Sequence, residues 1–381
     1  MIIDGKIYLD YNATTPVTPE IAKTAEHAML QAWGNPGSSH QAGRAAATIF
    51  EKARARTASL INCSPDEIIF TSGGTESNNA VIFGVAEAQR TKGNHIITSR
   101  IEHPALLAPC QRLETAGFDI TIAGVDSNGQ VNPEEIGAAI TPATILVSIM
   151  LANNETGAIQ PIGQIGKICR KKGVLLHTDA AQAVGKIPVD VKVLNVDYLT
   201  IAGHKLYAPK GTGALYIRKG APLAPLMHGG GQQAGLRPGT EPVPLAAALG
   251  KACELAKASL AEEMKRETAL KENFFKLLTQ KTGNIYRYSS GIDTLPNTLC
   301  LAFPGIAGHK ILAGADGIMA STGAACHSGD TKISHVITAM GIPKHIAMGT
   351  VRLSLGRFTD QEQVETAAMR LAEAVRAATK L

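Results

Sequence analysis

A carboxylate and a lysine follow two neighbouring predicted strands of this chain. Asp179 comes after the apolar run at residues 173–177, and Lys205 comes after the next run, at residues 197–201. A carboxylate there can keep the nitrogen of a pyridine ring protonated, and a lysine amine can form a Schiff base; pyridoxal phosphate chemistry needs both groups. The competing interpretation is that Asp179 caps a helix and that Lys205 is solvated.

A glycine-containing turn precedes this pair in the chain. Gly73, Gly74 and Thr75 lie between a predicted strand and a predicted helix. Free N–H groups at a helix N-terminus favour phosphate, and glycines let the backbone approach it. An ordinary capped turn between strand and helix would have the same pattern. No Gly-Lys pair of the chain is followed by the Ser or Thr of a P-loop.

One cysteine differs in its surroundings from the others. Cys326 lies among small residues at 321–329, which suits a loop that could bring a thiol into a site, whereas Cys110, Cys169 and Cys253 lie in helical apolar patterns. A lone cysteine is more often a small buried core residue. His327 follows it, but no further Cys or His stands at ligand spacing, so we expect no metal site.

Short apolar runs alternate with helical patterns through the first part of the chain. The predicted strands are residues 67–70, 94–98, 144–151, 173–177, 197–201 and 213–217, and the predicted helices include 77–90 and 161–172. Strands separated by helices indicate a mostly parallel sheet covered on both faces, which binds ligands at the carboxyl ends of its strands.

The pattern changes to a long helical segment at residues 245–279. Beyond it we expect strands at 298–303, 317–320 and 350–354 and a final amphipathic helix, opened by a capping box of Thr359 and Glu362, with Val364, Ala368, Leu371 and Val375 on one face. This predicts a smaller α+β domain to which the first dozen residues return. The predicted boundaries are 16–256 for the large domain, and 1–15 with 257–381 for the small one.

Composition limits the class of protein. The 381 residues are 45% hydrophobic and 18% charged, as in an ordinary globular protein. A net charge of +5 without a long basic run, and only 4% aromatic residues, argue against nucleic-acid binding. We expect no membrane span and no export signal, and hence a cytoplasmic location. The six cysteines are widely spaced, without C-x-x-C pairs, and are expected to be thiols.

The motifs together resemble a known family. They occur at residues 8–16, 34–36, 71–78, 102–104, 152–157, 177–182, 203–205, 237–241 and 352–357, so that they cover nearly the whole chain. The sequence resembles the cysteine desulfurases of the NifS/IscS type and their near relative selenocysteine lyase. These are pyridoxal phosphate enzymes of aminotransferase class V, and the resemblance implies fold type I, with a mostly parallel seven-stranded sheet in an α/β large domain.

The resemblance also implies roles for individual residues. The cofactor would be held by Gly74, Thr75, His103, Asn154, Asp179, Gln182, His204 and Lys205, with Thr240 reaching the neighbouring subunit of a homodimer. Lys205 would carry the cofactor, His103 would stack on its ring as a candidate acid or base, and Gln182 would donate to its ring hydroxyl. Arg352, with Asn12 and Asn154, would bind the substrate, and Cys326 would take its sulfur as a persulfide.

The chain departs from the family at two places. Ala202 stands where many relatives, though not the selenocysteine lyases, have a serine that contacts the phosphate. The cysteine loop reads Gly-Ala-Ala-Cys-His-Ser, which is closer to the loop of the lyases than to the Gly-Ser-Ala-Cys-Thr-Ser of typical desulfurases. We expect removal of sulfur from L-cysteine to leave L-alanine, with sulfur passed to an acceptor such as an Fe–S scaffold protein. The alternatives are a selenocysteine lyase, a class V aminotransferase and a non-catalytic scaffold.

Overall fold

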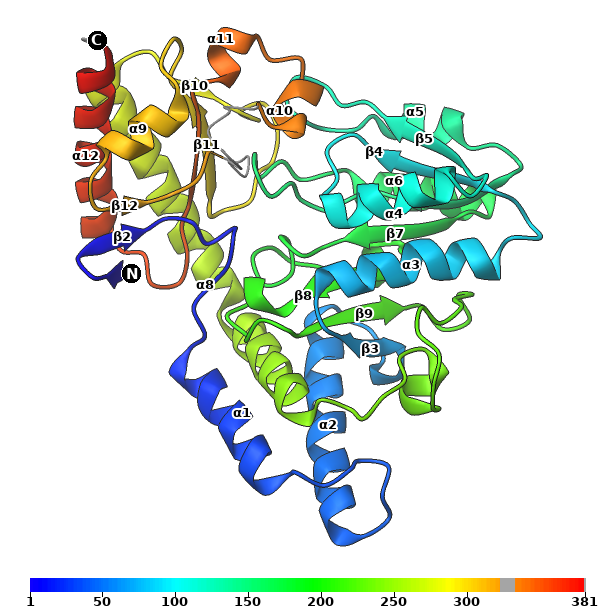
Figure 1. Ribbon diagram of the computed structural model, residues 1–381. Helices are drawn as coiled ribbons and strands as arrows, with labels where there is room; N and C mark the ends of the chain where they lie inside the picture. Colours follow the sequence, from blue (N-terminus) through cyan, green and yellow to red (C-terminus); the bar gives the residue numbers. More distant parts are fainter. Residues whose placement is uncertain (323–332, 380–381) are drawn as a thin grey trace.

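A seven-stranded sheet forms the centre of the molecule. The computed structural model describes residues 1–322 and 333–379 (Figure 1). The strand order is β3-β9-β8-β7-β6-β4-β5, and β9 alone runs in the direction opposite to the other six strands. The strands are β3 (Ile68–Thr71), β4 (His95–Ser99), β5 (Asp119–Ala123), β6 (Thr144–Ser148), β7 (Leu175–Asp179), β8 (Tyr198–Ala202) and β9 (Gly213–Ile217). The predicted α/β fold with a mostly parallel sheet is confirmed.

Helices cover both faces of this sheet. Successive residues of a strand point to opposite faces, and because both faces carry apolar side chains, both are buried by helices. Ile69, Tyr198 and Leu215 pack on the face of α3 (Gly74–Ala88) and α4 (Pro104–Glu114). Their strand neighbours, among them Phe70 and Leu199, pack on the opposite face. That second face is covered mainly by α2 (Gln41–Leu60), α5 (Pro133–Ala139), α6 (Ile162–Lys172) and the first half of α8 (Val243–Thr282), with α1 (Pro19–Gln31) beside α8.

Two three-stranded sheets lie at the other end of α8 (Figure 1). They are formed by β1 (Ile2–Ile3), β2 (Lys6–Tyr8) and β12 (Ile318–Met319), and by β10 (Tyr286–Arg287), β11 (Thr298–Ala302) and β13 (Thr350–Ser354). The second half of α8 packs there through Leu270, Phe274 and Leu278. Because β2 pairs with β12, the first residues do return to the C-terminal part, as predicted.

Shorter helices complete the chain. They are α7 (Val191–Leu194), α9 (Gly308–Gly314), α10 (His335–Ala339), α11 (Lys344–Ala347) and α12 (Gln361–Thr379), with 3-10 turns η1 (Pro65–Glu67), η2 (Gly203–Lys205) and η3 (Gln232–Gly235). The four apolar positions predicted to share a face of α12 are all buried. Within the described ranges, 1–322 and 333–379, no helix is long and apolar enough to span a bilayer.

The start of α12 differs from the predicted one. The predicted capping box on α12 is wrong: the side chain of Asp360 accepts the Gln363 N–H at 2.9 Å, while Thr359 Oγ1 accepts from Gly356 N–H. Asp360, one residue after Thr359, has a carboxylate oxygen that can also accept from the free N–H groups, and it occupies the cap position.

The proposed domain boundaries stay a prediction, although α8 joins two separate apolar cores.

Candidate active site

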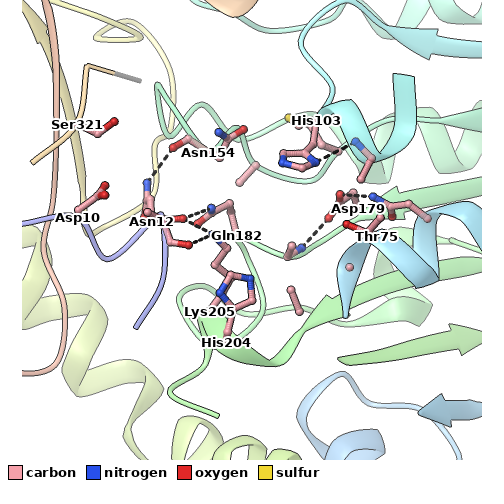
Figure 2. A pocket seen from close by; sticks show the side chains of 18 of the residues that line it. Asp10, Asn12, Thr75, His103, Asn154, Asp179, Gln182, His204, Lys205 and Ser321 are labelled. Atoms are coloured by element: carbon pink, nitrogen blue, oxygen red, sulfur yellow. Dashed lines mark hydrogen bonds between the residues drawn. The ribbon is translucent and has the colours of Figure 1, made fainter. Parts of the chain in front are cut away.

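A cavity of about 450 Å³ lies at the carboxyl ends of β6, β7 and β8. It is lined by Asp10, Asn12, Ala13, Gly74, Thr75, Asn78, His103, Ala105, Met150, Ala152, Asn154, Asp179, Ala181, Gln182, Ala202, His204, Lys205, Ser321 and Arg352. Figure 2 shows Asp179 and Thr75 toward one end and Asp10 and Ser321 toward the other. This is the edge where a parallel sheet is expected to bind ligands.

One end of the cavity is the N-terminus of α3, which suits an anion. Gly73 caps the helix with φ of +146°, a conformation that L side chains rarely adopt. A Cβ on Gly213 of the neighbouring strand would lie only 2.6 Å from the Cα of Gly73. Gly74 and Thr75 open the helix and line the cavity. The predicted turn between strand and helix is therefore present, with its free N–H groups beside the cavity.

His204 lines the same cavity from η2. Its Nδ1 is 3.1 Å from Thr14 Oγ1, and burial together with the charge of Lys205 lowers its pKa to about 4. A neutral imidazole keeps one N–H that it can donate. Ala202, which stands in place of the family's serine, is buried at the end of β8 and lines the cavity without offering a hydroxyl.

Asp179 ends β7 with its carboxylate held from two sides. Asn78 Nδ2 donates to Oδ2 at 2.7 Å, and the Ala181 N–H donates to Oδ1 at 2.9 Å. The second contact is the cap-like turn of the competing interpretation, yet the carboxylate also lines the cavity. A buried carboxylate fixed in this way can face a cationic ring nitrogen, so the residues present fit a pyridine ring at this point.

Lys205 follows β8 on η2 and is half-buried rather than freely solvated. Its ammonium donates to the carbonyl oxygens of Asn12 and Ala13, the second at 2.6 Å. Burial, and secondarily the positive charge of Arg352, lower its pKa to about 8. A lysine with a lowered pKa supplies more free amine, which is the reactive form for carbonyl chemistry.

His103 is the N-cap of α4, and the cap determines which ring nitrogen carries a proton. Its Nδ1 accepts the Ala105 N–H at 3.1 Å, which leaves Nε2 as the protonated nitrogen of the neutral ring. Burial lowers the pKa of His103, the nearby Asp179 opposes that shift, and Lys205 reinforces it. Figure 2 shows the imidazole of His103 across the cavity from Lys205.

Arg352 of β13 lies at the other end and is 5% exposed. Its Nη1 donates to the Asn154 carbonyl at 3.0 Å, and its Nη2 lies 2.6 Å from Asp10 Oδ1. Its buried Nε has no hydrogen-bond partner in the part of the chain that the structure describes. A guanidinium can bind a carboxylate through two parallel hydrogen bonds, so Arg352 could bind a substrate carboxylate in exchange for that of Asp10.

The structure brings most of the predicted site residues to one cavity, with two exceptions. Thr240 is exposed and does not line the cavity of its own chain, and Cys326 lies outside the described residues. The side chain of Asn12 is occupied by protein partners: Lys186 and Asn297 donate to its oxygen, and its nitrogen donates to Thr298. The backbone carbonyl of Asn12 accepts in turn from Gln182 and Lys205.

Sequence reasoning missed three residues of this site. Asp10 and Asn78 lie inside motifs that were noticed, but no role was expected for their side chains, because their partners Arg352 and Asp179 are 342 and 101 residues away. Lys186 lies four residues after Gln182, at the edge of the cavity, and a lysine at such a position is usually solvated. No cluster of His, Cys, Asp or Glu within residues 1–322 and 333–379 could hold a metal ion.

Comparison with known proteins extends these observations. The family model described as aminotransferase class V matches residues 7–366. A protein named cysteine desulfurase IscS from Dictyoglomus turgidum is 45% identical over 361 residues, covering 94% of this chain and 92% of that protein. Another of the same name, from Methanosarcina thermophila, is also 45% identical, over 94% of this chain and 89% of its own length.

Solved structures agree with the sequence comparison. One titled NifS-like protein has a TM-score of 0.91 at 38% identity, covering 98% of this chain and all of the other. A NifS-like protein from Rickettsia africae gives 0.86 at 32% identity, over 97% of this chain and 99% of its own. A structure titled SspA in complex with cysteine gives 0.82 at 35% identity, covering 91% of this chain and 98% of SspA.

Proposed function

The chain belongs to the class V aminotransferase family and is a pyridoxal-phosphate-dependent cysteine desulfurase, and from this premise we propose which of its residues perform the reaction. The observation that carries the assignment is that Lys205, Asp179, His103 and Arg352 line one cavity. The relatives do not favour the selenocysteine lyase alternative.

The cofactor would be held by residues whose chemistry fits its parts. Gly74, Thr75 and His204 would bind the phosphate at the N-terminus of α3, and Asp179 would pair with the ring nitrogen. Gln182 would donate to the ring hydroxyl, Asn154 would lie close by, and His103 would stack on the ring. When bound, pyridoxal phosphate supplies an electron-accepting ring that stabilises negative charge on the α-carbon of the substrate.

The residues at the substrate end would orient L-cysteine. The guanidinium of Arg352 would bind its carboxylate in place of Asp10, so that the present contact of Nη2 with Asp10 would be given up. Lys205 Nζ, once released from covalent attachment, would take the α-proton, and its lowered pKa makes it a suitable base. His103 Nε2 carries a proton that it could donate during the reaction.

Cys326 would take the sulfur. Its thiolate would attack the substrate sulfur, and the carbon–sulfur bond would break with its electron pair left on the β-carbon. Protonation of the β-carbon and return of a proton to the α-carbon would then yield L-alanine. The protein then carries a persulfide that an acceptor thiol can remove. Cys326 lies outside the described residues, and its role follows from the chemistry of a thiol alone.

The reaction is tested by giving the purified protein L-cysteine. Alanine should form, sulfide should be released when a reductant is present, and the mass of the peptide that contains Cys326 should rise by one sulfur atom. Cys326→Ala should abolish sulfur removal from cysteine and retain measurable cleavage of selenocysteine, because selenium is the better leaving group. Wild-type rates of cysteine desulfuration in Cys326→Ala would overturn the assignment of the nucleophile.

The partners follow from the same proposal. Thr240 is exposed here, and in a homodimer it would complete the phosphate site of the other subunit, so the active enzyme should sediment as a dimer. A fully active monomer would contradict the shared site. The sulfur acceptor would be a thiol protein such as an Fe–S scaffold. The five described cysteines are unpaired, which suits a reducing compartment such as the cytoplasm.

A further inference from the structure

A lysine outside the predicted site holds two amide side chains at the edge of the cavity. Lys186 Nζ donates to Gln182 Oε1 at 2.7 Å and to Asn12 Oδ1 at 3.0 Å. Gln182 Nε2 in turn donates to the Asn12 backbone carbonyl at 2.9 Å, which also accepts from Lys205. Figure 2 shows Gln182 and Asn12 side by side next to Lys205. These contacts form one small network in the wall of the cavity.

The chemistry of Lys186 decides which end of the Gln182 amide faces which partner. An ammonium has three donors and no acceptor, so it can face only the oxygen of an amide. The nitrogen is then directed at the Asn12 carbonyl, and it retains a second N–H. A flipped amide would set its N–H groups against the Lys186 donors and its oxygen against that carbonyl. Both contacts would be repulsive when Lys186 is an ammonium. Burial lowers the pKa of Lys186 to about 7, and its neutral amine could accept from a flipped amide, but the amide oxygen would still be directed at the Asn12 carbonyl oxygen, and that contact is repulsive in either state.

The chain is shaped to place this lysine. Gly185 has φ of +78°, and a Cβ there would lie 2.1 Å from Leu206 Cδ2, so only glycine fits the turn that leads to Lys186. The charges that face Lys186 are Lys205 on η2, Glu267 on α8 and Arg352 on β13. The nearest partners of its Nζ are nevertheless the two amide oxygens, rather than a carboxylate.

We propose that Lys186 is a positioning residue that orients Gln182, so that an amide N–H, and not the amide oxygen, is presented to the hydroxyl of the cofactor ring. The inference rests on the proposed function, in which Gln182 donates to that hydroxyl. Without Lys186 the amide can rotate, and its oxygen would repel the electron-rich ring oxygen. Lys186 itself touches neither cofactor nor substrate in this role.

The test compares holoenzymes by the visible absorption band of the bound cofactor and by the Kd for pyridoxal phosphate. Lys186→Met should shift the band and weaken binding about three- to tenfold, as for one lost hydrogen bond. Lys186→Arg, which keeps cationic donors, should restore both, and it also serves if the methionine variant fails to fold. The exposed Lys192→Met is the matched control and should behave as wild type.

A double-mutant cycle separates orientation of Gln182 from any other role of Lys186. In a Gln182→Ala background, Lys186→Met should cause no further change in band or Kd, because the group through which it acts is gone. Additive effects of the two substitutions, or an unchanged band and Kd in Lys186→Met, would overturn the inference. Failure of the wild-type protein to bind pyridoxal phosphate would instead overturn the proposed function.

Discussion

The two ends of the cavity are built in different ways. At the cofactor end, Asp179 ends β7, His103 caps α4 and Lys205 lies on the 3-10 turn that follows β8, and each makes hydrogen bonds that hold it in place. At the substrate end, Arg352 meets Asp10 and the carbonyl of Asn154, from three distant parts of the chain, and its Nε has no partner among the described residues.

The difference suits the two tasks. A resident cofactor is served by groups whose positions are already determined, because no binding energy is then spent on ordering them. A substrate must enter and leave, so the group that binds it has to exchange partners. The Asp10 carboxylate provides such a partner in the absence of substrate, since it neutralises a guanidinium that would otherwise be a buried unpaired charge.

The largest effect should come from the cofactor end. Lys205→Ala should lose the lysine-linked absorption band and all measurable turnover, because only a lysine amine can attach the cofactor, even if pyridoxal phosphate still binds through its other contacts. Borohydride reduction of the wild type, followed by peptide mapping, should label Lys205. A label on a different lysine would contradict the assignment.

Substitution of Arg352 should affect substrate binding and leave the cofactor in place. Lys cannot reproduce the two parallel hydrogen bonds of a guanidinium, so Arg352→Lys should raise KM for cysteine at least about tenfold, equivalent to about 1.4 kcal/mol. Its cofactor absorption should match the wild type. An unchanged KM would move the carboxylate site elsewhere, and a changed absorption spectrum would show that the two ends are not independent.

The buried imidazole of His177 makes the stability of the sheet beneath the cofactor end depend on pH. It is buried in β7 between Ser148 and Thr200, and burial lowers its pKa to about 3, below the ordinary value of 6.5. Between these values the unfolded chain binds the proton and the folded chain does not, so stability falls as pH falls from 6.5 toward 3. The free energy of unfolding should be roughly 1 kcal/mol lower at pH 6 than at pH values well above 6.5.

Denaturant unfolding at several pH values measures this effect. His177→Asn should flatten the acid dependence of the free energy of unfolding, whatever it costs in absolute stability. His27→Asn, at an exposed position on α1, is the matched control. An equally steep acid dependence in His177→Asn and wild type would show that another group is responsible.

The smallest effect is expected at Asp10. If its carboxylate exchanges with that of the substrate, Asp10→Asn should lower KM for cysteine by at most about threefold, because the asparagine oxygen can still accept from Arg352 Nη2 and only the charge of Asp10, which is partly exposed and screened by solvent, is lost. Steady-state kinetics with cysteine measures it. A large rise in KM would show instead that Asp10 positions Arg352, and the substrate end would then be as firmly held as the cofactor end.

Much of the fold was predictable because its signals are local. Apolar runs between turn residues identified six strands of the large sheet, whereas β5 was missed: its residues Asp119–Ala123 are half-buried or exposed at the sheet edge and lack a continuous apolar run. The cap of α12 was misplaced by one residue, because Thr359 and Asp360 both carry oxygens that can cap a helix.

The sequence by itself determined the cofactor end. A parallel sheet places the residues after its strands along one edge, so the order of strand, Asp179, strand, Lys205 was enough to bring those residues together. Only the tertiary structure decided the partners of Arg352, Asn12 and Lys186, because those partners lie as far as 342 residues away along the chain. Hydrogen bonds and charge pairs depend on distance in space, and no spacing along the chain records that distance.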